Sequence, residues 1–176
     1  LCDISGEVTD LSLIKDNVLV ETASFPEGRM SMMRDMAALL KRSPEEVLSM
    51  LTLHFDGLLD IHALSPKSDA IIEKSRNMWL SSFRAAVTEL RSRHFLPREI
   101  EITAHPIMRQ WLGPVLSSLS FPFGVSGGER TFKAHFIDAL FLRKSVSFQD
   151  ASQFDVFLAL EALFAEKMLN LAEYKV

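Results

Sequence analysis

The first thirty residues alternate between apolar and polar positions in a way that predicts a small antiparallel sheet. Leu1 to Ile4 is a short apolar run, and Thr9 to Lys15 alternates at every second position. The intervening Ser5-Gly6-Glu7 is typical of a turn, and Asp16-Asn17 is typical of a two-residue hairpin loop. We therefore expect a three-stranded meander whose last strand is Val18 to Phe25.

Helical periodicity replaces this alternation after Pro26-Glu27-Gly28. Arg29 to Lys41 is predicted to be a helix, and a second helix is predicted from Ser43 to about Phe55. Its first residues combine an N-cap serine, a proline at the first helical position and a glutamate that completes a capping box. After a loop at Ser65-Pro66, a long helix is predicted from Asp69 to Arg93. Its core-facing stripe consists of Ile72, Ser75, Trp79, Phe83, Ala86, Val87 and Leu90.

The rest of the chain mixes both periodicities. Glu99 to Thr103 is predicted to be a strand, and Pro106 opens a helix over Ile107 to Ser118. Phe121 to Gly128 contains proline and glycines and is expected to be a loop, whereas Thr131 to Phe148 is expected to be extended. An apolar helix from Ala151 to Tyr174 closes the chain. This order predicts an α/β fold, a mixed sheet with an N-terminal β-meander and helices on its faces.

Composition narrows the possible functions. The chain has 176 residues, 48% hydrophobic and 24% charged, which suits one globular domain over residues 1–176. A lone cysteine, Cys2, excludes a disulfide framework, and the five histidines show no metal-ligand spacing. The net charge of −4 argues against nucleic-acid binding. The longest apolar stretch, Phe154 to Ala165, contains two acids and is too short to span a membrane.

The most informative segment is Asp3-Ile4-Ser5-Gly6-Glu7-Val8-Thr9-Asp10. A strand, turn and strand with Ser-Gly in the turn is most often only a hairpin. Successive backbone N–H groups in such a turn can also form an anion-binding concavity. A carboxylate at the end of the first strand, such as Asp3, can hold hydrated Mg²⁺ beside bound phosphates.

This segment resembles the second phosphate-binding loop of actin-fold ATPases, Asp-Ile-Gly-Gly-Gly/Glu-Thr-Thr-Asp. The resemblance is greatest to the bacterial cell-division (FtsA-like) and pilus-assembly (PilM-like) branch. The downstream order also fits, with a strand that ends in Pro-x-Gly at Gly28, a helix that opens with Ser-x-x-Glu at Ser43, and a strand over Glu99 to Thr103 that feeds a helix. The resemblance is specific over residues 1–30, moderate from there to about residue 118, and weak in the rest of the chain.

The resemblance implies the second, C-terminal half of an actin-like (ribonuclease H-like) fold, with ATP and Mg²⁺ bound between two such halves. Asp3 would be the catalytic group that orients the metal or water, and no residue here would ligate the metal directly. The nucleotide-binding positions are Ser5, Gly6, Glu7, Val8 and Thr9 for the terminal phosphates, and Ala104 and His105 for the nucleoside.

Three departures from the family pattern predict a degenerate site. The loop has Ser5 and Glu7 where glycines are common, and the adenosine strand ends in Ala104-His105-Pro106 instead of glycines, so the backbone approaches a base less closely. The Glu-x-x-Lys pair expected in the second helix falls on Leu48 and Leu51.

A chain that begins inside a buried strand without methionine is expected to be a fragment or a processed form. The phosphate loop of the other half is expected upstream.

Two functions follow as hypotheses from this resemblance. The first is an actin-like ATPase-fold protein of the cell-division or pilus-assembly type, whose incomplete ATP site turns over no ATP in this chain alone. The alternative is a non-enzymatic scaffold that assembles at such a machine. Expected partners are the missing N-terminal half, further copies of the chain or the machine's proteins. The expected location is bacterial and cytoplasmic, peripheral to the inner face of the membrane through partners.

Other motifs have simpler interpretations. The run Gly124-Val125-Ser126-Gly127-Gly128 matches a nucleophile elbow by letters, but it lacks the strand and helix that an elbow needs. Glu99 and Glu101 are expected to be solvated, because Ile100 and Ile102 mark the buried side of their strand. The Arg91-Ser92-Arg93-His94 cluster suits the negative end of a helix dipole, and His105 is expected to cap the following helix.

Overall fold

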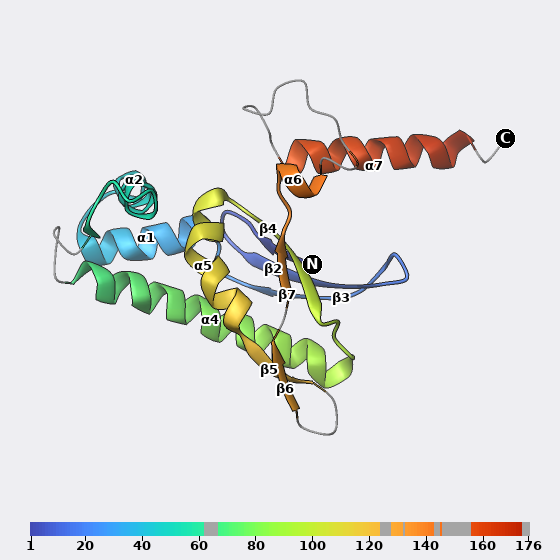
Figure 1. Ribbon diagram of the computed structural model, residues 1–176, viewed down its shortest axis with the longest axis horizontal. Helices are drawn as coiled ribbons and strands as arrows, with labels where there is room; N and C mark the ends of the chain where they lie inside the picture. The colour runs from blue at the N-terminus through green and yellow to red at the C-terminus, as the bar shows by residue number, and fades with distance from the viewer. Residues whose placement is uncertain (62–66, 124–127, 132, 143–144, 146–155, 174–176) are drawn as a thin grey trace. The chain divides into compact units, whose positions relative to one another are not determined.

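A computed structural model describes residues 1–61, 67–123, 128–131, 133–142, 145 and 156–173, and it divides the chain into two compact units, Leu1–His135 and Phe136–Val176 (Figure 1). The strands are β1 (Cys2–Ile4), β2 (Thr9–Lys15), β3 (Val18–Phe25), β4 (Glu99–Ala104), β5 (Ser120–Phe123), β6 (Gly128–Thr131) and β7 (Lys133–Phe136). The helices are α1 (Arg29–Leu40), α2 (Pro44–Phe55), α4 (Ser68–Arg93), α5 (Pro106–Ser118), α6 (Ala139–Leu142) and α7 (Val156–Glu173).

The main sheet is a five-stranded mixed sheet in the order β3-β2-β1-β4-β7. β2 lies antiparallel to both β1 and β3, so the predicted meander is confirmed. β4 lies parallel to β1, with Cys2 opposite Ile102 and Ile4 opposite Ala104. The α/β class with a mixed sheet is therefore confirmed, and the carboxyl ends of two parallel strands meet at one edge of the sheet.

The β2–β3 hairpin turns at the predicted two-residue loop. Asp16 and Asn17 have φ values of 51° and 61°, the left-handed backbone that a type I′ turn requires and that Asp and Asn tolerate better than other residues with a side chain. The pairing register shifts between Leu13 and Ile14, as in a β-bulge, so Leu13 lies opposite Glu21 and Ile14 opposite Leu19.

Local capping residues set the helix boundaries where the sequence predicts them. The Ser43 side chain accepts a hydrogen bond from the Glu46 N–H at 3.2 Å, and the Glu46 carboxylate accepts one from the Ser43 N–H at 2.8 Å. This capping box, with Pro44 in the first turn, begins α2 as predicted. Lys41, at φ 56°, ends α1 in the left-handed conformation typical of a helix terminus.

The core of the first unit forms where α4 packs against β2 and β3. The Trp79 ring stacks on Phe83 at 5.1 Å between centroids and meets Phe25 edge-on at 5.8 Å. Thr9, also fully buried, accepts a hydrogen bond from the indole Nε1 of Trp79 at 3.0 Å, so the one polar atom of that ring is satisfied. The predicted stripe is buried along α4 from Ser75 to Leu90.

Two predictions after α5 are wrong in part. Residues 121–123 form β5, which pairs with β6 in a separate two-stranded sheet, where a loop is expected. A proline is compatible with such a ribbon because every strand in it is an edge strand. Within the stretch expected to be extended, β7 is a strand but Ala139–Leu142 is helical. The apolar closing helix is found as α7, and its predicted start at Ala151 lies outside the described residues.

The second unit has its own small core. Ile137, Leu142 and Ala159 are buried together, with Leu160 and Leu163 of α7 packed against them. None of the helices within the described residues has the length and apolar character needed to cross a membrane.

Candidate functional site

The predicted site residues converge at the carboxyl ends of β1 and β4. Because Ile4 lies opposite Ala104, the loop of residues 5–8 that follows β1 lies beside the turn at His105 that follows β4. Ligands of open α/β sheets bind outside the carboxyl ends of adjacent parallel strands. The structure thus brings together Asp3, the loop and His105 from segments a hundred residues apart.

Asp3 is held in place from the neighbouring strand. The buried Thr103 hydroxyl donates a hydrogen bond to Oδ1 of Asp3 at 2.5 Å, which fixes the orientation of the half-buried carboxylate. No group of three or more His, Cys, Asp or Glu side chains suited to a metal occurs among the described residues. Asp3 can therefore act on a hydrated ion or a water molecule, and in the part of the chain that the structure describes no further ligands join it in a metal-binding group.

The loop after β1 is fastened to the first turn of α1 through its backbone carbonyls. The N–H groups of Gly28, Arg29 and Met30 donate to the carbonyl oxygens of Glu7, Ser5 and Gly6, at 3.1, 2.8 and 2.6 Å. These are N–H groups that a helix start leaves without intrahelical partners. A Cβ on Gly28 would lie 2.6 Å from the Glu7 carbonyl carbon and from the Val8 nitrogen, so the contact requires glycine. Pro26-Glu27-Gly28 is thus a docking element for the loop.

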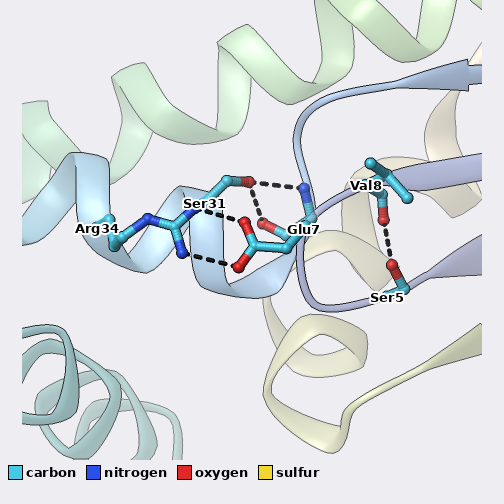
Figure 2. A network of polar contacts seen from close by, with 6 residues as sticks. Ser5, Glu7, Val8, Ser31 and Arg34 are labelled. Atoms are coloured by element: carbon cyan, nitrogen blue, oxygen red, sulfur yellow. Dashed lines mark hydrogen bonds and ion pairs between the residues drawn. The ribbon is translucent and has the colours of Figure 1, made fainter.

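Hydrogen bonds inside the loop decide which donors are left for a ligand. Both the N–H and the hydroxyl of Ser5 donate to the Val8 carbonyl, at 3.1 and 2.8 Å (Figure 2). The Thr9 hydroxyl donates to the Glu27 carbonyl at 2.7 Å and is buried. None of the described residues accepts a hydrogen bond from the N–H groups of Gly6, Glu7 or Val8. Those three backbone N–H groups lack an acceptor among the described residues, and Gly28 packs against the Glu7 and Val8 nitrogens but not against Gly6. The side chains of Ser5 and Thr9 are engaged within the protein.

Glu7 does not present an unpaired negative charge at the loop. Figure 2 shows the Arg34 guanidinium of α1 holding both carboxylate oxygens of Glu7, at 2.8 and 2.5 Å. This hydrogen bond from Arg34 lowers the pKa of the exposed Glu7 carboxyl, so the pair is ionic at neutral pH. Glu7 is the departure from the family pattern that most opposes phosphate binding, and its negative charge is therefore offset by Arg34, 27 residues away.

His105 caps α5, as predicted, because its Nδ1 accepts a hydrogen bond from the Ile107 N–H at 3.3 Å. Burial and the nearby Arg29 guanidinium lower the pKa of His105, so the ring is neutral at pH 7.

Arg29 is the site residue that sequence reasoning missed. Its N–H binds the Ser5 carbonyl, its charge acts on His105, and among the described residues no carboxylate pairs with it. Its place directly after the docking glycine, Gly28, is the signal that could have identified it.

Of the positions expected to meet the nucleoside, only His105 has a polar side chain. Leu51 is buried in the hydrophobic core and Leu48 is half-buried, both on α2, which packs against α1 and α5. Ala104 ends β4 without the glycines that would let a base approach the backbone. Of the other motifs, residues 124–127 of the elbow-like run lie outside the described residues. Glu99 and Glu101 are exposed, as predicted.

No protein-family model, curated protein or solved structure matches this chain. The resemblance to actin-fold ATPases therefore remains a prediction from the sequence motifs.

Proposed function

We propose that this chain is a phosphate-binding half of an actin-like ATPase fold, of the cell-division or pilus-assembly type, with a degenerate ATP site. The observation that carries the proposal is the convergence at the ends of β1 and β4. There, the loop of residues 5–8, Arg29 and His105 meet beside an aspartate oriented by Thr103. Such a constellation suits the triphosphate end of a nucleotide.

The residues present fit the phosphates and do not fit the nucleoside. The N–H groups of Gly6, Glu7 and Val8 would bind phosphate oxygens, and the Arg29 guanidinium would add a charge-assisted contact. Asp3 would hold hydrated Mg²⁺, which neutralises phosphate charge when it is bound. Ala104 and Leu51 offer no polar contact to a base or ribose in their side chains. Binding without base preference, and no hydrolysis by this chain alone, are the expected properties.

The second candidate function is a non-enzymatic scaffold that assembles at a division or pilus machine, through another copy or through the machine's proteins. The apolar packing at Leu48 and Leu51 favours this alternative, because it removes two nucleoside contacts at once. In that case the docked loop is a structural element that stabilises the start of α1.

Titration of the purified chain with a fluorescent ATP analogue, with and without Mg²⁺, tests the proposal. We expect the analogue to bind weakly and more tightly with Mg²⁺ than without it. ATP, GTP and inorganic triphosphate should displace the analogue about equally well. Arg29→Gln should weaken the binding about tenfold, as expected for one charge-assisted contact. The matched control is Arg84→Gln, an exposed arginine on α4 away from the site.

Two results would contradict the proposal. Absence of any nucleotide or triphosphate binding, together with self-association on size-exclusion chromatography that is the same with and without ATP, would establish the scaffold instead. Tight ATP binding with hydrolysis by this chain would show that the site is complete and not degenerate.

A further inference from the structure

Glu7 and Arg34 form an ion pair beside the part of the loop that is open to an anion. The N–H of Gly6 has no acceptor among the described residues, and the nearest atom to a Cβ on Gly6 would be the Met30 Cγ at 4.0 Å. The next residue in the chain, Glu7, carries a carboxylate. An unpaired negative charge at this place would repel a phosphate that binds the Gly6 N–H.

The Arg34 guanidinium holds this carboxylate from α1. Its Nη1 and Nη2 donate to Oε1 and Oε2 of Glu7 at 2.8 and 2.5 Å, a bidentate arrangement that fixes direction as well as distance (Figure 2). The start of α1 is bonded to the loop through three backbone hydrogen bonds. The guanidinium and the carboxylate therefore extend from two segments that are already fastened to each other.

The pair contributes little to holding the loop in place. The side chains of Arg34 and Glu7 are 51% and 61% exposed, and exposed ion pairs stabilise a fold only weakly. The loop is docked instead by backbone hydrogen bonds and by its close contact with Gly28. Arg34 lowers the pKa of Glu7, so protonation does not remove the negative charge at neutral pH. The main consequence of the pair is electrostatic.

We propose that Arg34 is a positioning residue for the anion site, which holds the Glu7 carboxylate against α1 and offsets its charge beside a phosphate at Gly6. The inference rests on the proposed function and adds the pair that sets the affinity for the phosphate group. Removal of one partner changes the charge at the loop by one unit, whereas removal of both partners leaves it unchanged.

Titration of the full chain and three variants with the fluorescent ATP analogue, in the presence of Mg²⁺, tests this inference. Arg34→Gln leaves the Glu7 carboxylate unpaired and should weaken binding about fivefold, because water and salt moderate the effect of one exposed charge. Glu7→Gln leaves the guanidinium unpaired and should strengthen binding about threefold. The double variant, Glu7→Gln with Arg34→Gln, should bind within about twofold of the unaltered chain.

A purely structural role of the pair predicts a different order of affinities. If the pair only stiffened the loop, all three variants would bind more weakly and to a similar extent, and that result overturns the inference. An Arg34→Gln variant that binds like the unaltered chain also overturns it, while the proposed function stands. Absence of binding by the unaltered chain overturns the proposed function, and this inference with it.

Two exposed residues of α4 supply matched controls. Arg84→Gln removes an exposed arginine, and Glu89→Gln removes a carboxylate that is 63% exposed and pairs with Arg93 at 2.7 Å. Both controls should bind the analogue like the unaltered chain, and equal losses in Arg84→Gln and Arg34→Gln overturn the inference. Circular dichroism checks that each variant is folded.

Ionic strength provides an independent readout of the same charges. An increase from about 0.1 M to about 1 M shortens the screening length from about 10 Å to about 3 Å, so the differences in affinity between the variants should shrink. Differences that persist unchanged at the higher ionic strength overturn the electrostatic role of Arg34.

Discussion

Gly28→Ala is the substitution that most directly tests how the loop of residues 5–8 is held. The added Cβ would lie 2.6 Å from two backbone atoms of the loop, the Glu7 carbonyl carbon and the Val8 nitrogen. The φ of Gly28, −103°, is open to alanine, so the cost is steric and not conformational. To reach an ordinary contact of 3.4 Å, the loop and the start of α1 must separate by about 0.8 Å.

That separation weakens the three hydrogen bonds that the N–H groups of Gly28, Arg29 and Met30 make to the loop. At about 1 kcal/mol net for each bond, the free energy of unfolding should fall by about 3 kcal/mol. For a chain of this size the melting temperature should then fall by about 6–12 °C. Thermal and urea unfolding followed by circular dichroism measure both quantities.

Two other glycines provide matched controls. The nearest atom to a Cβ on Gly6 would be the Met30 Cγ at 4.0 Å, so Gly6→Ala should change the unfolding free energy by less than about 0.5 kcal/mol. Gly57 has φ +73° and open space around it, so Gly57→Ala should cost about 1 kcal/mol from backbone strain alone. If the free energies of unfolding of Gly28→Ala and Gly6→Ala differ by less than about 1 kcal/mol, the loop is not fastened to α1 as described.

Three further predictions concern side chains around the site. Thr9→Val should lower the free energy of unfolding by about 1–3 kcal/mol in urea titrations, because it leaves the buried Trp79 N–H without an acceptor. The pKa of His105 is lowered in the folded state, so the folded protein favours the neutral ring. The stability that the neutral ring contributes is present above the pKa of the unfolded state and is lost as the pH falls through the pKa of the folded state. The melting temperature should therefore decrease on acidification from pH 7, and less so in His105→Asn, where a side-chain acceptor is kept. The pKa of Glu7 is also lowered, so Arg34→Gln should reduce stability slightly at neutral pH, and this difference should vanish at acidic pH once Glu7 is protonated.

The sequence predicts the first 118 residues well because the signals there are local. Asp16-Asn17 specifies its turn through the backbone preferences of two adjacent residues, and the capping box at Ser43 needs only four. The errors lie after α5, where β5 forms by pairing with β6 although its proline is typical of a loop. When a segment has weak periodicity, whether it forms a strand depends on the strand that pairs with it. The local sequence pattern does not show which segment that is.

The same distinction explains what sequence reasoning missed at the site. The hydrogen bond between Trp79 and Thr9 joins residues 70 positions apart, and the one between Thr103 and Asp3 spans 100 positions. The neutralisation of Glu7 by Arg34 follows only once α1 is docked on the loop. A motif identifies the loop, but the partners that determine its charge and rigidity come from the fold.

Under the proposed function, phosphate and nucleoside recognition would depend on different features of this chain. Phosphate recognition would depend on backbone N–H groups of the loop, whose position is held by docking on Gly28 and not by the side chains of Ser5 and Glu7. Nucleoside recognition would depend on side-chain size and polarity, which Ala104 and Leu51 do not supply. The proposal therefore predicts that base specificity is lost while phosphate binding is kept. Equal competition by ATP, GTP and inorganic triphosphate follows from this asymmetry, and a strong preference for ATP would show that the nucleoside contacts survive in a form that these residues do not reveal.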